Sequence, residues 1–361
     1  MPLPAAVPDR QPGAASNRGG RRGAIRRAGA IATVALAAGC NAGDEPSFNC
    51  GKPATPIHAV QGPGASSPLE GSNVTIEGIV TGVFSSSAPG SLEGFFLQEE
   101  SAQQDSEPAT SEGIFVYTAR DEVELRRGRR ARVAGTVKEF NGLTEISPVE
   151  TVRDCGAAAA DATRPHTLEL PFDANAERES LEGMWVRLPQ SLVINDTYQA
   201  LRYGELVLAS RRLWQPTQVA EPGAAAKRLR ARNQRDTLVL DDGRNGSYRR
   251  PFIPGRDAGA AVAADNPIRT GYRTEPFEGI FHYAFGAYRV HPLERPGLKA
   301  APNPRPEPPA RAPGTTRVAA LNLDAYFATP DDSATGCGPE RSGCRGADSA
   351  RELQRQTAKL V

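Results

Sequence analysis

The sequence predicts a mainly β protein whose first three hundred residues form two small barrel-like modules. Short apolar runs with alternating polar positions recur between turn residues from residue 57 to residue 292. The chain holds 36 Gly and 31 Pro but only 6% aromatic residues, a composition that favours short strands and many turns. Because 43 Lys and Arg nearly balance 42 Asp and Glu, any attraction to nucleic acid must come from local patches.

Residues 1–39 have the pattern of a signal peptide, and we exclude them from the fold. Arginines between residues 18 and 27 form a basic stretch, and the apolar run Ala28–Ala38 follows. The sequence L-A-A-G-C ending at Cys40 resembles the bacterial lipoprotein signal, which implies lipidation of Cys40 and attachment to the outer-membrane surface. An ordinary secretory signal, with an extracellular product, is the alternative. Residues 40–55 would then be the lipid anchor and its polar tether.

Export would permit disulfide bonds among the remaining cysteines. Cys50 and Cys155 bracket the first folded module, whereas Cys337 and Cys344 lie in one loop. The economical pairing is Cys50–Cys155 with Cys337–Cys344, one of three possible connectivities. A zinc site is the alternative, although no histidine lies near any of the four in the sequence.

The first module, residues 56–156, is predicted to be a closed barrel of the oligonucleotide/oligosaccharide-binding (OB) type. Its first strand contains Gly78 and Gly82, where a strand can bend or bulge. A bent first strand followed by four others suits a small five-stranded barrel. The expected strands are 74–84, 94–98, 113–117, 130–140 and 143–146.

The second module, residues 157–300, is predicted to be a degenerate OB-like barrel. Its sequences E-G-M-W-V and E-G-I-F-H echo E-G-I-V and E-G-I-F-V of the first module. An Ala- and Arg-rich insert occupies 224–235, and a Pro-rich linker, 301–316, follows the module. The clearest expected strands are 181–188, 203–209, 236–243 and the run 277–292.

The last residues combine an apolar strand, a Cys-bearing loop and an amphipathic helix. T-R-V-A-A-L-N-L-D-A-Y-F (316–327) brings Asn322 to the end of the strand, G-C-G-P (336–339) follows, and the helix begins after residue 344. This order resembles the opening of the endonuclease/exonuclease/phosphatase (deoxyribonuclease-I-like) domain of secreted bacterial nucleases. The first module, with I-H-A-V-Q-G-P-G at 57–64, resembles the OB-fold module that precedes that domain. Residues 317–361 are therefore expected to be the first strand and helix of a truncated α/β-sandwich catalytic domain.

The resemblance implies that Asn322 belongs to a metal and phosphate site, with Mg²⁺ or another divalent cation assisting phosphodiester hydrolysis of extracellular DNA or RNA. The family pattern is F-N-V-L-N-Y-F. This chain departs from it at Leu321, Asp324 and Ala325, and Ala325 replaces the second Asn. No histidine follows Asn322 in the sequence, so we expect this chain to be inactive by itself.

Two basic runs are candidates for nucleic-acid contact. The first, R-R-G-R-R-A-R at 126–132, would lie beside the oligonucleotide face of an OB barrel, with nearby phenylalanines as stacking rings. Solvated arginines and core rings are the alternative interpretation. The second run lies within 227–235 and is expected to be a solvated helix or loop. The residues concerned are Arg126, Arg127, Arg129, Arg130 and Arg132 in the first run, the rings Phe95, Phe96, Phe115 and Tyr117, and Lys227, Arg228, Arg230, Arg232 and Arg235 in the second run.

The sequence thus predicts the N-terminal part of an extracellular metal-dependent nuclease whose β modules position the substrate. A non-enzymatic lipoprotein whose barrels bind nucleic acid, glycan or protein is the alternative. A phosphatase or lipid phosphodiesterase on the same catalytic fold is a third possibility. The four histidines, at 58, 166, 282 and 291, have no metal-ligand spacing and are expected to be structural or on the surface.

Overall fold

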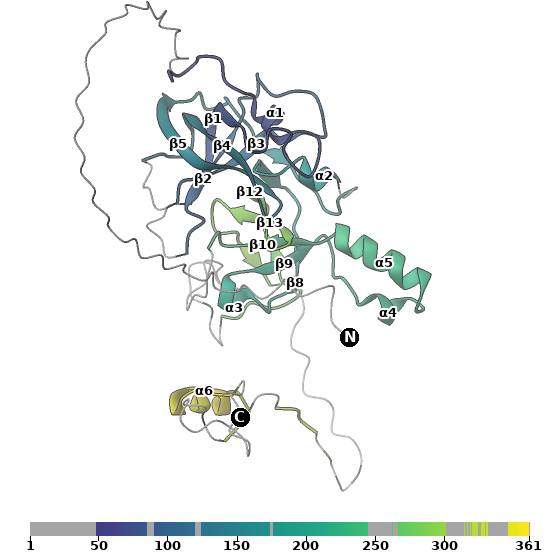
Figure 1. Ribbon diagram of the computed structural model, residues 1–361. Helices are drawn as coiled ribbons and strands as arrows, with labels where there is room; N and C mark the ends of the chain where they lie inside the picture. Colours follow the sequence, from purple (N-terminus) through teal and green to yellow (C-terminus); the bar gives the residue numbers. More distant parts are fainter. Residues whose placement is uncertain are drawn as a thin grey trace, which may run out of the picture. The chain divides into compact units, whose positions relative to one another are not determined.

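The computed structural model describes residues 48–84, 90–119, 124–173, 176–244, 262, 266–300, 314, 316, 318, 320–323, 326–328, 330 and 346–360. The chain divides into two compact units, Met1–Asn303 and Pro304–Val361, and each is considered by itself (Figure 1). The signal peptide, the lipidation site Cys40, and Cys337 and Cys344 lie outside the described residues. None of the described helices is both long enough and apolar enough to cross a bilayer.

The first unit begins with a closed five-stranded barrel (Figure 1). All five predicted strands form, and they close in the order β1-β2-β3-β5-β4. The β3–β5 pair is parallel and the other neighbours are antiparallel. The helix α1 (Ile57–Gln61) precedes the strands β1 (Asn73–Phe84), β2 (Gly94–Gln98), β3 (Gly113–Tyr117), β4 (Arg129–Phe140) and β5 (Leu143–Ala157).

Alternating side chains fill the barrel and a bend in β1 shapes it. The register of the β1–β2 pair shifts between Val80 and Gly82, the bulge that the glycine predicted. The interior cluster is aliphatic apart from Phe95 and includes Ile76, Ile114 and Val133. The predicted disulfide Cys50–Cys155 is confirmed and joins the segment before α1 to the end of β5.

The rest of the first unit is one nine-stranded sheet with short helices, which differs from the second barrel that the sequence predicted. The strand order is β14-β11-β8-β9-β10-β13-β12-β7-β6. Its strands are β6 (His166–Thr167), β7 (Trp185–Leu188), β8 (Val193–Asp196), β9 (Leu206–Ala209), β10 (Leu238–Leu240), β11 (Arg273–Thr274), β12 (Phe277–Ala284), β13 (Ala287–Pro292) and β14 (Leu298–Lys299). Its helices are α2 (Ala176–Glu179), α3 (Ala200–Tyr203), α4 (Pro216–Val219) and α5 (Ala224–Arg235).

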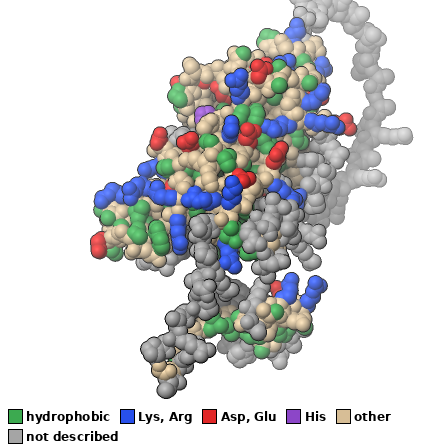
Figure 2. All heavy atoms as spheres, turned by 180° about the vertical axis from the view of Figure 1, so that it is seen from behind, with side chains coloured by type: hydrophobic (Ala, Val, Ile, Leu, Met, Phe, Trp, Pro, Cys, Tyr) green, Lys and Arg blue, Asp and Glu red, His purple; other side chains and the backbone are tan. Residues whose placement is uncertain are grey.

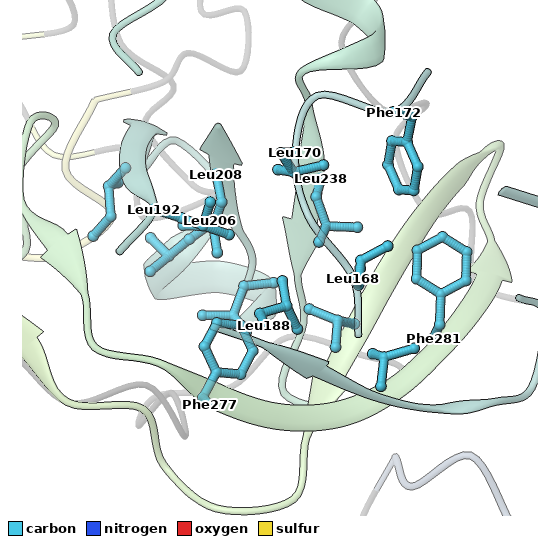
Figure 3. Packing of buried hydrophobic residues seen from close by; sticks show 14 of the residues in the cluster. Leu168, Leu170, Phe172, Leu188, Leu192, Leu206, Leu208, Leu238, Phe277 and Phe281 are labelled. Carbon is cyan, nitrogen blue, oxygen red and sulfur yellow. The ribbon is translucent and has the colours of Figure 1, made fainter. Parts of the chain in front are cut away.

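The difference arises because alternation predicts which residues are strands but does not select their partners. The run 277–292 is a hairpin of β12 and β13, and β10 pairs with β9 on one side and, in parallel, with β13 on the other. A cluster rich in leucine packs against the sheet and includes Leu168, Leu188 and Phe281 (Figure 3).

The barrel and the sheet share an apolar and hydrogen-bonded junction. Phe96 and Phe115 of the barrel pack with Ile280 of β12, and a Cβ at Gly82 would lie 2.9 Å from Ile280, so the glycine permits this approach. The Glu182 carboxylate accepts the Thr144 N–H at 2.9 Å, and Gln98 Oε1 accepts the Trp185 N–H at 2.8 Å. The two parts therefore form one packed unit.

The second unit contains the predicted C-terminal helix, α6 (Ala350–Leu360). Ser349 caps its start: Ser349 Oγ accepts the Glu352 N–H, and the Glu352 carboxylate accepts the N–H of Asp348, both at 3.3 Å. The predicted strand at 316–327 is not seen in the described residues of that stretch, none of which belongs to a strand. A strand requires a hydrogen-bonded neighbour, and the described part of this unit supplies none.

Candidate functional site

Three arginines of the first basic run are paired with carboxylates of the barrel. Arg132 is only 3% exposed and donates to Glu77 and to the carbonyls of Lys52 and Pro53, each at 2.8 Å. Arg129 pairs with Asp154 at 2.7 Å, and Arg130 pairs with Glu100. These contacts hold the barrel together, so the predicted cluster is divided and Arg132 is not accessible to a ligand.

Arg126 and Arg127 are the exposed members of that run. The Arg127 guanidinium lies 4.4 Å from the centre of the Trp185 ring and 3.7 Å from Glu278. Arg126 has no ion-pair partner within the part of the chain that the structure describes. The first basic run therefore presents one unpaired cation to the surface.

The predicted stacking rings are mostly buried, as the alternative interpretation expected. Phe95 lies inside the barrel, and Phe96 and Phe115 lie at the junction with the sheet, their centroids 4.7 Å apart. His282 of β12 contacts both junction rings. The outer face of β2 and β3 is thus covered by the nine-stranded sheet.

The second basic run forms the exposed helix α5. Its alanines, leucine and basic residues are strong helix formers, and Arg232 and Arg235 in its last turn interact favourably with the helix dipole. Lys227, Arg228, Arg230 and Arg232 are exposed, and no described carboxylate pairs with them. Figure 2 views the molecule from behind and shows Lys and Arg side chains in a row on the projecting lobe that Figure 1 labels α5.

A groove of about 610 Å³ separates α4 from α5. Arg228, Arg232 and Arg235 line it, because residues four and seven positions apart share one helix face. Val219 and Leu229 supply an apolar floor. The groove therefore combines three cations with a small hydrophobic surface, an arrangement suited to a flexible anionic ligand with apolar rings.

An exposed aromatic side chain lies two residues before α4 in the chain. Trp214 is 49% exposed, and the Arg212 guanidinium lies 4.5 Å from its ring centre. The Trp214 carbonyl accepts a hydrogen bond of 3.0 Å from Asn233 Nδ2, which ties this segment to α5. Trp214 could not be selected from the sequence, because only the fold ties its segment to the helix that carries the second basic run.

A second cluster gathers one histidine and three carboxylates on the barrel. His58 Nδ1 lies 2.7 Å from Glu99 Oε2 and 3.5 Å from Glu112 Oε2, and His58 Nε2 lies 3.9 Å from Asp105 Oδ2. His58 comes from α1, Glu99 follows β2, and the other two lie in the segment leading to β3. Only the fold joins residues so distant in sequence, which is why the spacing of the histidines did not reveal the cluster.

Backbone hydrogen bonds orient the carboxylates of this cluster. The Ile57 N–H donates to Glu99 Oε1 at 2.5 Å, and the Asp105 N–H donates to Glu112 Oε1 at 3.1 Å. Asp105 accepts the Glu107 N–H at 2.9 Å. Burial raises the pKa of Glu112 to about 9, and a hydrogen bond to Glu99 and the charges of Glu99 and Asp105 add to this effect.

Other buried ionic groups hold the sheet together. The Arg289 guanidinium is fully buried and donates to Glu205 at 3.1 Å, to Asp241 and to the Ala284 carbonyl at 2.6 Å. Burial, with the neighbouring charges of His291 and Arg289, lowers the pKa of His282 well below its usual value. His282 and His291 are both buried inside the sheet, as the structural interpretation of these histidines expected.

Asn322 lies exposed in the second unit. Among the described residues, the one group of three or more His, Cys, Asp and Glu side chains close enough to share a metal ion is His58, Asp105 and Glu112 in the first unit. The described residues therefore do not form the Mg²⁺ site that the family resemblance implies at Asn322.

Comparison with known proteins adds one match. Residues 158–302 match the model of a family described as a domain of unknown function (DUF8508). The match spans all nine strands of the second sheet and the helix α5. A search of curated proteins finds no match to the chain.

Proposed function

We propose that this chain binds nucleic acid through α5 and forms the substrate-holding, N-terminal part of an exported metal-dependent nuclease. The observation that carries the binding step is the row of exposed cations on α5 without carboxylate partners. Export and attachment through Cys40 rest on the signal pattern, and the nuclease assignment rests on the order of motifs around Asn322.

The barrel topology supports the OB assignment within this proposal. A closed five-stranded barrel in the order β1-β2-β3-β5-β4 is compatible with the Greek-key barrel of OB folds. OB folds bind oligonucleotides on the face of their second and third strands. Because Phe96 and Phe115 on that face pack against the sheet, the ligand must use another surface, and α5 offers one.

The charge pattern of α5 favours an anionic partner. Arg228 and Arg232 are four residues apart, where like charges destabilise a helix by roughly 0.2–0.5 kcal/mol. No described carboxylate offsets this repulsion. A phosphate backbone would replace the repulsion with attraction and release counterions.

Trp214 favours a ligand with unpaired bases. Stacking of a base on an exposed aromatic ring contributes about 1–3 kcal/mol and requires no particular sequence. The groove cations and Trp214 together match the pattern of a positively charged track with an aromatic platform. We therefore propose single-stranded DNA or RNA as the preferred ligand.

Binding of a fluorescent single-stranded DNA by the full chain tests the proposal. Replacing Lys227, Arg228, Arg230 and Arg232 by Gln should weaken binding at low salt by at least about tenfold, because four phosphate contacts are lost. The matched control replaces four exposed cations that are paired with carboxylates, Arg127, Lys138, Lys299 and Arg355, and carries the same change in net charge. Equal losses in both variants would contradict a specific role of α5.

A further inference from the structure

We propose that His58, Asp105 and Glu112 bind one divalent transition-metal ion, most suitably Zn²⁺, and that Glu99 is a positioning residue for the His58 ring. The site lies on the barrel and does not depend on the nucleic-acid proposal or on Asn322. It would join α1 to the segment between β2 and β3.

The distances are close to those of a metal site. One ligand atom of each of the three residues lies within 4.8 Å of the other two. Ligands bonded to Zn²⁺ at about 2.0–2.2 Å in a tetrahedral arrangement lie roughly 3.3–3.6 Å apart, so the three atoms must approach one another by roughly 1 Å. Small side-chain rotations therefore suffice to bring the three atoms around one ion.

A buried oxygen without a partner points into the cluster. Glu112 is only 7% exposed, and its Oε2 has no hydrogen-bond partner among the described residues. That oxygen lies 3.5 Å from His58 Nδ1. A bound cation would give this buried oxygen a ligand bond.

The charge balance of the cluster also favours a cation. Glu99, Asp105 and Glu112 converge on one imidazole, and no described Lys or Arg pairs with any of the three. Arg130, which is near, pairs with Glu100 instead. His58 is therefore the one basic side chain that the described residues place against these three carboxyl groups, and a bound cation would add a second positive centre.

Glu99 is placed to orient the His58 ring. Its Oε2 is 2.7 Å from His58 Nδ1, and its other oxygen accepts the Ile57 N–H at 2.5 Å. In metal sites the ring nitrogen that does not bind the ion commonly donates to such a carboxylate, which fixes the tautomer and the ring orientation. His58 Nε2, 3.9 Å from Asp105 Oδ2, is then the metal-binding nitrogen, and the Glu112 carboxylate, whose Oε2 lies nearer Nδ1, has to rotate toward Nε2 to reach the same ion.

The ligand types select the class of ion. An imidazole nitrogen suits Zn²⁺ and its transition-metal neighbours, whereas Ca²⁺ and Mg²⁺ prefer oxygen ligands alone. The side chains of His58 and Asp105 are 20% and 28% exposed, so an ion could enter from solvent and retain a water molecule. A site with three protein ligands and one water is a common arrangement for Zn²⁺.

Calorimetric titration of the chelator-treated full chain with Zn²⁺, and absorption spectroscopy with Co²⁺, test this site. We expect one Zn²⁺ per chain with release by a chelator, and a Co²⁺ spectrum typical of a nitrogen- and oxygen-ligated ion. Zn²⁺ should bind at least tenfold more tightly than Mg²⁺ or Ca²⁺. Failure of the folded wild-type chain to bind Zn²⁺ or Co²⁺, or tighter binding of Mg²⁺ or Ca²⁺, would overturn the proposal.

Variants locate the ion. D105N and H58Q should each weaken Zn²⁺ binding by at least tenfold, as second-shell changes alone typically cost 10–100-fold. E100Q is the matched control, because Glu100 adjoins the cluster in sequence but pairs with Arg130, and its Zn²⁺ affinity should equal that of the wild type. D105N changes a partly exposed side chain, and circular dichroism will verify its fold. Unchanged binding in folded D105N would place the ion elsewhere and overturn the assignment.

Discussion

Arginines that are adjacent in sequence have opposite roles in this protein. The sequence showed five of them between residues 126 and 132 but could not show which meet a carboxylate, since Glu77, Asp154 and Glu100 come from other segments. Arg132 is buried among such partners, whereas Arg126 is exposed. Composition therefore locates a basic run but does not say which of its residues lie at the surface.

Substituting these two arginines should separate the roles. Arg132→Gln is expected to lower the free energy of unfolding by roughly 3–5 kcal/mol, because it leaves Glu77 and two carbonyls without their buried partner. Arg126→Gln should change it by less than about 0.5 kcal/mol. Urea unfolding followed by circular dichroism measures both. Similar stabilities for the two variants would show that Arg132 is not a structural residue.

Glu182 should make stability depend on pH. Burial raises its pKa well above the usual value, although a hydrogen bond from the Thr144 N–H opposes the shift. The folded state therefore holds a proton that the unfolded state loses above about pH 4.5, so this contribution is fully present below that pH. It is lost as the pH rises toward the folded pKa, at roughly 1.4 kcal/mol per pH unit.

Glu182→Gln tests this dependence. Glutamine retains the carbonyl oxygen that accepts the Thr144 N–H and does not ionise. We expect the stability of the variant to fall less steeply than that of the wild type between pH 5 and pH 8, as measured by urea unfolding. Parallel pH profiles for the two proteins would show that Glu182 does not hold the proton.

At the scale of elements, strands were predicted more successfully than their pairing. The five barrel strands were predicted because alternation and glycine punctuation are local signals. The nine-stranded order was not, because β10 and β13 pair across nearly fifty residues and no local pattern encodes that choice. The helix at 224–235 was described only as a helix or loop, and its exposure on a projecting lobe depends on the fold.

Arg228→Glu should affect the stability of α5 and its ligand affinity in opposite directions. The new carboxylate would lie four residues before Arg232, the favourable orientation for an ion pair, and would stabilise the helix by roughly 0.2–0.5 kcal/mol. Binding of single-stranded DNA should weaken, because a cation in the groove is replaced by an anion. Thermal unfolding and fluorescence anisotropy measure the two effects. Loss of both stability and binding would indicate that Arg228 is a structural residue.

At the scale of the whole molecule, two features stabilise the first unit. The disulfide ties the N-terminal segment of the barrel to β5, and the apolar junction joins the barrel to the nine-stranded sheet. The Cys50–Cys155 pairing was predicted from the position of the two cysteines around one module and is confirmed. The junction was not predicted, since Phe96 and Phe115 have the same alternation whether they face a ligand or another sheet. This is why the expected oligonucleotide face proved to be covered.

Replacing both Cys50 and Cys155 by Ser should lower stability substantially. The bond joins residues 105 positions apart, and closing a loop of this length restricts the unfolded chain by about 4.7 kcal/mol in the entropy model. We expect a loss of about 2–5 kcal/mol in urea unfolding, with the fold retained at low temperature. A loss below 1 kcal/mol would contradict the expected constraint.

The most direct test of the central proposal is the salt dependence of single-stranded DNA binding by the full chain. Each phosphate contact contributes about 0.7 to the slope of log K against log salt concentration. The wild type should show a steep slope, and replacing Lys227, Arg228, Arg230 and Arg232 by Gln should reduce it by about 2.8, whereas replacing the paired cations should not. Equal slopes for the wild type and the α5 variant would contradict the proposal that α5 holds nucleic acid.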